Sequence, residues 1–231
     1  VSGNPDLVET DITNIDARYE YYFNSTDLIS FALFYKDMTN PIEDTRLDTT
    51  GTIPRFSFHN AAAATLSGFE LSWYKHLDFI SDSLDNFIFS GNYTHIQSEI
   101  ELTEDQKETL VTQERELQGL SPNVINLAMT YEDDENRIVT LSYNKMDERL
   151  MRVAIKNGTV ILGLDDYEIP PDLVDLTWIE KFRVDALSTN MALTFKAKNL
   201  LDDETVWTQG GKTTLMYNTG RSYSVPLSAK F

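Results

Sequence analysis

The sequence contains no cysteine, which excludes disulfide scaffolds, thiolate zinc sites and cysteine nucleophiles. Basic residues are scarce, since 19 Lys and Arg stand against 37 Asp and Glu, for a net charge of -18. Nucleic-acid affinity comes mainly from Lys and Arg that neutralise phosphates, so we expect no nucleic-acid partner. No hydrophobic run approaches the ~18 residues that a transmembrane helix requires.

Catalytic and metal-binding motifs are also missing. His59, His76 and His95 lie far apart and lack the spacing of metal ligands. Neither a Gly-x-Ser-x-Gly elbow nor a His-Glu-x-x-His helix occurs. Acidic clusters at 133–135, 165–166 and 202–204 are interpreted as solvated loop charge. A loop Ca²⁺ site is the alternative, although no EF-hand spacing supports it. We therefore predict no enzyme, no cofactor and no metal site.

The hydrophobic residues that are present alternate with polar ones. Successive side chains of a strand point to opposite faces, so such segments predict strands with one apolar and one polar face. Most segments exceed the ~5–6 residues of a usual soluble strand and suit the ~9–11 residues that cross a bilayer. The nine predicted strands are centred on 15–23, 29–35, 69–73, 87–93, 125–131, 139–143, 174–178, 191–197 and 223–231.

The connections between these segments alternate in length. Short connections at 24–27, 80–85, 132–136 and 184–187 alternate with long ones at 37–62, 102–120, 154–171 and 200–220. Outer-membrane barrels have short periplasmic turns and long extracellular loops. Loops above ~12–15 residues are uncommon in compact soluble domains. The pattern predicts an all-β protein, a transmembrane antiparallel β-barrel.

The number of strands predicts that the barrel is incomplete. Single-chain bacterial barrels have an even number of strands, with both ends in the periplasm. Nine strands cannot satisfy this, so we interpret residues 1–231 as one domain, the C-terminal part of a larger barrel. The remaining strands are expected N-terminal to Val1.

The two faces of the strands have different expected surroundings. Membrane barrels place aromatic girdles at both interfaces, so the apolar face is interpreted as lipid-facing and the polar face as the lumen wall. A soluble β-sandwich core would show the same alternation and remains the alternative. The aromatic residues assigned to the lipid face are Tyr19, Tyr21, Phe23, Tyr35, Trp73, Phe87, Tyr93, Tyr131, Tyr143 and Trp178.

Five stretches carry a resemblance to a known family. They are Asn4-Pro-Asp-Leu7; Phe34-Tyr-Lys-Asp37 with Asn40-Pro-Ile42; Ser67-Gly-Phe-Glu-Leu71; Leu117-Gln-Gly-Leu-Ser-Pro122 with Asn126; and Asn199-Leu-Leu-Asp-Asp203 with Gly220-Arg221 and Phe231. With these stretches in this order, the chain resembles the C-terminal barrel region of TonB-dependent outer-membrane receptors over nearly its whole length. The sequence at 18–23 looks closest to receptors of the Bacteroidetes type.

The resemblance implies a function. It suggests a barrel of ~22 strands with a plugged lumen, in the cell outer membrane. The expected activity is TonB-dependent uptake of a scarce nutrient, namely a siderophore, haem, cobalamin, oligosaccharide or peptide. The implied partners are the membrane lipid, the receptor's own plug domain and remaining strands, the TonB–ExbB–ExbD complex, the barrel-assembly machinery and the nutrient. A passive porin or adhesin barrel is the alternative, and a soluble β-sandwich carbohydrate-binding module is a third.

Two sets of residues are candidates for function. Ligand contacts are expected from the long loops, although an aromatic side chain in a loop more often packs locally than contacts a ligand. The long loops carry a net negative charge, which argues against a small anionic ferric chelate as the ligand. The last strand resembles the signal that the barrel-assembly machinery reads, and Pro226 within it is expected to mark a bulge. The candidate ligand contacts are Phe56, His59, Trp207, Gln209, Met216 and Tyr217. The candidate assembly signal is Tyr223, Val225, Leu227, Ala229 and Phe231.

Overall fold

A computed structural model describes residues 2–47, 55–133, 136–185 and 189–230. Its described part is built mainly of strands, and none of its helices is long and apolar enough to cross a membrane. The helical elements are η1 (Leu77–Phe79), η2 (Asp82–Leu84) and α1 (Glu104–Thr109). The strands are β1 (Asp11–Tyr22), β2 (Leu28–Thr39), β3 (Ile42–Leu47), β4 (Arg55–Asn60), β5 (Ala63–His76), β6 (Phe87–Glu101), β7 (Asn123–Glu132), β8 (Arg137–Met146), β9 (Arg149–Arg152), β10 (Ile155–Asn157), β11 (Val160–Leu162), β12 (Asp166–Ile169), β13 (Leu173–Val184), β14 (Thr189–Lys198), β15 (Thr205–Gln209), β16 (Lys212–Tyr217), β17 (Ser222–Ser224) and β18 (Leu227–Lys230).

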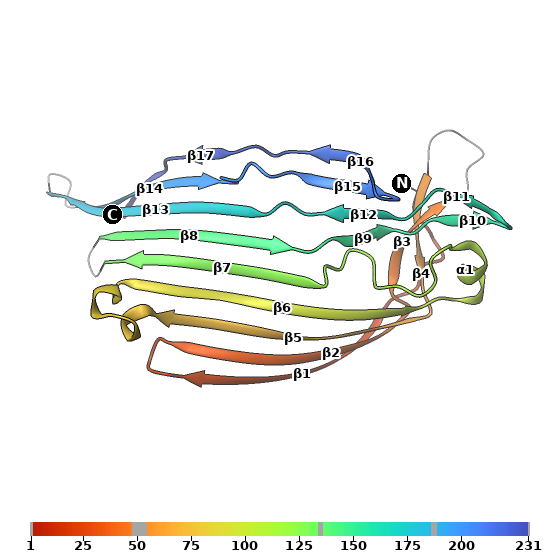
Figure 1. Cartoon of the computed structure of the whole chain (residues 1–231), viewed down its shortest axis with the longest axis horizontal. Coiled ribbons are helices and arrows are strands. Elements are labelled where there is room, and N and C mark those ends of the chain that lie inside the picture. Colours follow the sequence, from red (N-terminus) through yellow and green to blue (C-terminus); the bar gives the residue numbers. More distant parts are fainter. Residues whose placement is uncertain (1, 48–54, 134–135, 186–188, 231) are drawn as a thin grey trace.

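The main sheet confirms the predicted strands. Its order is β1-β2-β5-β6-β7-β8-β13-β14-β17, β18 also pairs with β14, and neighbouring strands are antiparallel. The short connections gather at one end of the sheet and the long ones at the other (Figure 1). We call these the turn end and the loop end.

The last predicted strand is divided into β17 and β18 at Pro226. The predicted bulge is wrong, because Lys196 pairs with Ser224 and Leu193 with Leu227 in one continuous register. The carbonyl of Pro226 still accepts a hydrogen bond from the Thr194 N–H at 2.9 Å. Proline has no N–H to donate a second hydrogen bond to β14. The strand pair therefore lacks one hydrogen bond here, but no extra residue is inserted as it would be in a bulge.

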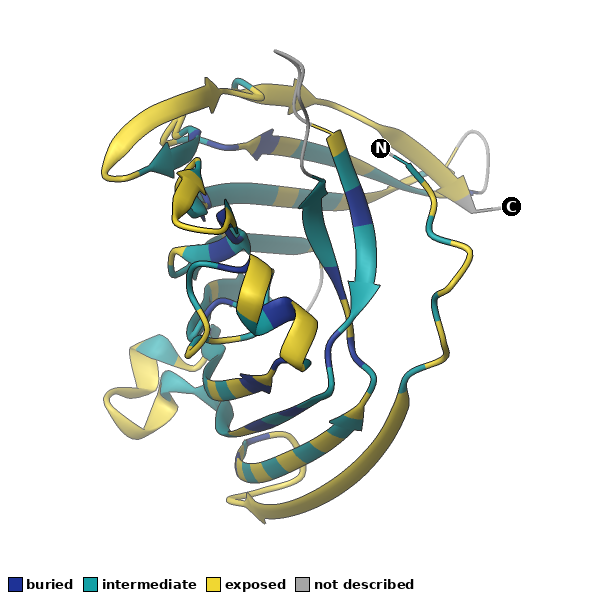
Figure 2. Ribbon diagram, turned by 90° about the vertical axis from the view of Figure 1, so that its right-hand side faces the viewer, coloured by how far each residue is buried: buried dark blue, intermediate teal, exposed yellow. Residues whose placement is uncertain are grey.

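Viewed from the loop end, the sheet curves into an open arc whose concave side is crossed by another hairpin (Figure 2). That hairpin is formed by β3 and β4. The barrel is not closed within this chain, because β1 and the β17–β18 strand are both edges of the sheet. The architecture is therefore a segment of barrel wall, as the odd number of strands predicted.

The apolar face of the sheet is exposed and the polar face is the more buried one. In β2, Phe31 is 43 % exposed whereas its neighbour Ser30 is 3 % exposed. Aromatic rings contact one another across strands on the outer face: Phe31 and Phe69 are stacked, and Trp73 and Phe89 are tilted. A soluble sandwich would bury this face against a second sheet. The β-sandwich alternative is therefore wrong, and the outer face has the character of a lipid-facing surface.

Gly91 shows how tightly the outer face is packed at one position. The residue lies between Trp73 on β5 and Leu127 on β7. A Cβ atom at Gly91 would lie 2.5 Å from the carbonyl oxygen of Asn126 and 2.8 Å from the ring of Trp73. Only glycine allows the indole ring to lie against the backbone here.

The apolar core lies at the loop end. Ala64 and Ile100 of the sheet pack against Leu110, Leu150 and Ile155 from the connections that follow β6 and β8. A smaller sheet of order β16-β15-β12-β9 continues the lines of the main strands beyond this core (Figure 1). The long connections are thus folded structures that pack on the sheet.

The turn end is held by a buried carboxylate. Asp27 is 0 % exposed. It contacts the Lys75 ammonium, lies 2.5 Å from His76 Nδ1 and accepts a hydrogen bond from Asn24 Nδ2 at 3.0 Å. Burial alone would raise the pKa of Asp27, but the hydrogen bonds from Lys75 and His76 outweigh burial and hold the pKa well below its usual range.

Candidate functional site

The structure brings together two of the six predicted ligand contacts. Phe56 of β4 and Trp207 of β15 both lie beside Arg152, the last residue of β9. The guanidinium carbon of Arg152 is 4.2 Å from the ring centroid of Phe56 and 5.2 Å from that of Trp207. Both distances are within the range of a cation–π interaction. Three long loops therefore meet at one cation.

The other predicted contacts are placed differently. His59 pairs with Glu43 across the β3–β4 hairpin, and burial lowers the pKa of its imidazole. Gln209 Nε2 donates to the carbonyl of Leu164 and to Asp166 Oδ1, both at 3.0 Å. Gln209 therefore ties the connection after β14 to the connection after β8, whereas His59 lies within its own hairpin.

Met216 and Tyr217 lie on the edge strand β16. Their side chains are exposed.

Arg152 was missed from the sequence, and it is the key cation of the cluster. Its closest carboxylate is that of Asp44, at 3.9 Å. Its Nε atom and the Nε1 atom of Trp207 are buried and have no hydrogen-bond partner among the described residues. A buried donor without an acceptor is costly. Both atoms are shielded from solvent, so these two donors do not themselves present a hydrogen bond to a ligand.

A second arginine completes the cluster. Arg46 of β3 lies 5.9 Å from the Phe56 ring, and its Nη1 donates to the carbonyl of Leu162 at 3.3 Å. Within the described part of the chain Arg46 forms no ion pair with a carboxylate, and Arg152 has only the long pair with Asp44 at 3.9 Å. We call Arg46, Arg152, Phe56 and Trp207 the Arg152 cluster.

Two nearby arginines have closer carboxylate partners. Arg115 pairs with Glu43, and Arg149 donates its Nε to Glu168 at 3.0 Å. The net acidic composition of the loops thus does not describe the Arg152 cluster, where positive charge and aromatic rings coincide. Such a surface suits an anionic ligand with planar groups.

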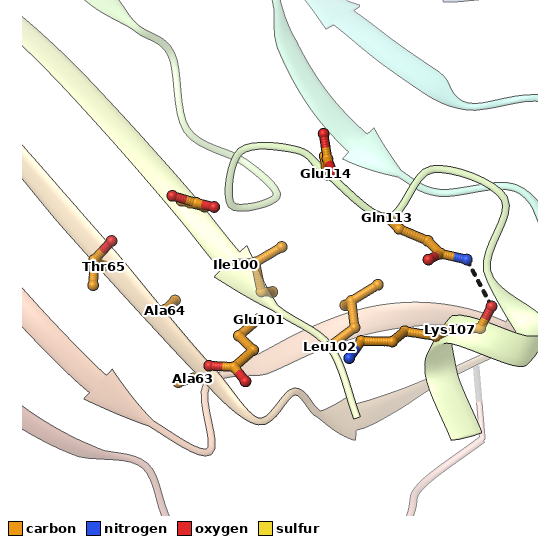
Figure 3. Close-up of a pocket in the computed structure, with 10 residues that line it drawn as sticks. Ala63, Ala64, Thr65, Ile100, Glu101, Leu102, Lys107, Gln113 and Glu114 are labelled. Atoms are coloured by element: carbon orange, nitrogen blue, oxygen red, sulfur yellow. Dashed lines mark hydrogen bonds between the residues drawn. The ribbon is translucent and has the colours of Figure 1, made fainter. Parts of the chain in front are cut away.

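A separate cleft of about 460 Å³ opens beside the loop end of β5 and β6. Glu101, Lys107 and Glu114 contribute charged side chains to it, and Gln113 Nε2 donates to the carbonyl of Lys107 at 2.7 Å (Figure 3). None of the predicted ligand contacts lines this cleft. Over the described ranges, no group of three or more His, Asp or Glu side chains is arranged to hold a metal ion.

The fold and the sequence together define the class of the protein, a transmembrane β-barrel. Residues 1–219 match the family model described as TonB dependent receptor-like, beta-barrel. The chain belongs to this family, which consists of outer-membrane receptors and transporters and is not an enzyme family.

Solved structures support the same fold. A variant of the ferric enterobactin receptor (PfeA) from Pseudomonas aeruginosa matches with a TM-score of 0.61 and 14 % identity, over 96 % of this chain. A second variant of that receptor, in complex with enterobactin, matches with a TM-score of 0.60 and 15 % identity, over 94 % of this chain. The chain spans 31 % of the length of these receptors. No curated protein matches the sequence significantly.

Proposed function

We propose that this chain is the C-terminal barrel segment of an outer-membrane receptor that imports a scarce nutrient in a TonB-dependent manner. The observation that carries the proposal is the open antiparallel wall with an apolar outer face, capped at one end by interlocked loops. The family match favours this receptor over a passive porin or adhesin. The loop end then faces outside the cell and the turn end faces the periplasm.

The remaining parts of the receptor belong to the same proposal. The edges at β1 and at β17–β18 would pair with strands outside residues 1–231, because unpaired backbone groups are costly in lipid. A plug domain would fill the lumen and receive the action of the TonB–ExbB–ExbD complex. The polar lumen wall, which includes the cross-strand pair Asn126 and Asn144, suits hydrogen bonds to such a plug. No covalent chemistry is needed.

The Arg152 cluster is the proposed ligand contact of this chain. Its two arginines and two aromatic rings suit an anionic, aromatic chelate better than a neutral oligosaccharide, a peptide or cobalamin. Of the two expected nutrients that are such chelates, a ferric siderophore and haem, we favour the ferric siderophore, because a structural neighbour is a receptor in complex with enterobactin. Met216 and Tyr217 supply further exposed contacts from the neighbouring strand β16.

The test uses the whole receptor and ferric enterobactin as the probe. Loss of a charge-assisted hydrogen bond corresponds to about tenfold or more in affinity, so Arg152→Ala should weaken binding by at least that factor. The control Lys212→Ala removes an exposed cation of β16 and should leave binding unchanged. Equal affinity of Arg152→Ala and the parent would refute the contact. Uptake of the probe that persists without TonB would refute the receptor mechanism.

A further inference from the structure

The lipid-facing side of the sheet carries a charged pair. Arg137 of β8 and Glu180 of β13 are cross-strand neighbours on the outer face. Arg137 donates its Nε to Glu180 Oε2 at 2.9 Å and its Nη2 to Glu180 Oε1 at 3.1 Å. Trp178 Nε1 also donates to Glu180 Oε2, at 3.1 Å. Ionisable residues on a membrane-facing surface are costly, so a bidentate pair there calls for a function.

An apolar groove of about 650 Å³ adjoins this pair. Arg137 begins β8, so the pair lies toward the turn end, while Leu176 and Phe195 lie further toward the loop end. The groove thus leads from the charged pair toward the middle of the membrane. Its lining is Arg137, Leu176, Trp178, Glu180, Leu193, Phe195 and Val225.

We propose that this groove binds a zwitterionic glycerophospholipid of the phosphatidylethanolamine type from the leaflet at the turn end. The guanidinium of Arg137 would bind the lipid phosphate through Nη1, which has no hydrogen-bond partner among the described residues. The carboxylate of Glu180 would bind the ammonium group. One acyl chain would follow the groove past Leu176 and Phe195.

Charge complementarity selects this lipid. A pair with one cation and one anion side by side matches a headgroup that carries both charges, whereas an anionic headgroup would be repelled by Glu180. A simple interfacial anchor accounts for Arg137 and Trp178, because both residue types are common at membrane interfaces. It accounts for neither Glu180 nor the groove.

The experiment measures lipid retention by the whole receptor in detergent. Phosphatidylethanolamine and phosphatidylglycerol with the same acyl chains are added in equal amounts, and bound lipids are counted by native mass spectrometry. The receptor should retain one phosphatidylethanolamine in preference to phosphatidylglycerol. Arg137→Gln should reduce this retention about tenfold, the factor for a lost hydrogen bond between charged groups.

Two further variants keep the test decisive. Arg183→Gln changes a cation on the opposite face of β13, which pairs with Asp185 at 3.2 Å, and should not alter retention. Leu176→Trp fills the groove without touching the pair and should also reduce retention, which covers the case in which Arg137→Gln does not fold. Retention unchanged in Arg137→Gln or Leu176→Trp, equally reduced in Arg183→Gln, or equal for both lipids would overturn the proposal. Binding of ferric enterobactin, measured on the same preparations, tests the proposed function separately.

Discussion

Arg115 and Glu43 form two parallel hydrogen bonds of 2.9 and 2.6 Å, and each side chain is 3 % exposed. The same carboxylate accepts the backbone N–H of Gln118 at 3.1 Å. The pair fastens the β3–β4 hairpin to the connection after β6. On its other side the hairpin is fastened by Arg46 to the carbonyl of Leu162. The hairpin is therefore the element that joins the loops into one body.

Breaking this pair should loosen the loop end. Arg115→Ala leaves the carboxylate of Glu43 buried without its partner, which typically costs ~3–5 kcal/mol. We expect faster amide hydrogen exchange in β3 and in residues 103–120, measured by mass spectrometry. The control Arg183→Ala removes an exposed pair with Asp185 and should leave these segments unchanged. Unaltered exchange in Arg115→Ala would show that apolar packing alone holds the loops.

The turn end should be sensitive to acid. The pKa of Asp27 is held below that of the unfolded chain, so its unfolded form binds more protons and stability rises with pH. The contribution is complete above the usual aspartate pKa of about 4 and is lost as the pH falls below it. The protection factors of amides at the adjoining ends of β2 and β5, which correct for the pH dependence of intrinsic exchange, should therefore fall on acidification.

Asp27→Asn supplies the matched variant for that experiment. It should loosen the turn at neutral pH by about 1–3 kcal/mol, because Lys75 and His76 lose a charged partner. It should also flatten the acid response. An equally steep response in Asp27→Asn would assign the acid sensitivity to other carboxylates.

A pair of neighbouring substitutions tests which face meets the lipid. Leu141 is exposed on the outer face near the middle of β8, and Ser142 faces the lumen side. Leu141→Arg should lower the outer-membrane level of the receptor, because arginine at the bilayer midplane costs ~2–4 kcal/mol. Ser142→Arg should be tolerated much better. Equal levels of the two variants on immunoblots would contradict the assigned facing.

The candidate assembly signal can be tested at the end of the chain. Tyr223, Val225 and Leu227 are exposed on the outer face, whereas Phe231 lies outside the described residues. Deletion of Phe231 should slow the appearance of the heat-modifiable barrel in pulse-chase experiments, while Ser228→Ala on the other face should not. Normal assembly after the deletion would show that Phe231 is no part of a signal.

The strands could be predicted from the sequence because contact with lipid on one face requires a regular pattern of apolar side chains. One side chain in two must be apolar, so the alternation of Phe31 with Ser30 is visible without any tertiary information. The long connections have no such regular pattern, so their internal structure could not be predicted. The connection after β6 contains α1, with Thr103 and Gln106 as its capping box, and the connection after β8 contains four short strands.

The Arg152 cluster shows where sequence reasoning ends. Phe56 and Trp207 could be selected as aromatic residues of long loops, but the cation between them could not. Arg152 ends a short strand that only pairs correctly once β12 is in place. Its role depends on contacts between residues far apart in the chain, and no local pattern records them.

Gly91 and the surface around it indicate which positions of the barrel wall can change in sequence during evolution. Acyl chains are fluid and fit any apolar outline, so a residue such as Ile29, which is exposed on the outer face away from the lipid groove, has no rigid neighbour to match beyond being apolar. Gly91, by contrast, has no room for even a methyl group beneath Trp73. Mutational tolerance should therefore be broad over most of the outer face and narrow at a few backbone-contact positions. Sequence change at the tolerant positions is compatible with the fold that this chain shares with the ferric enterobactin receptor, at a TM-score of 0.61 and only 14 % identity.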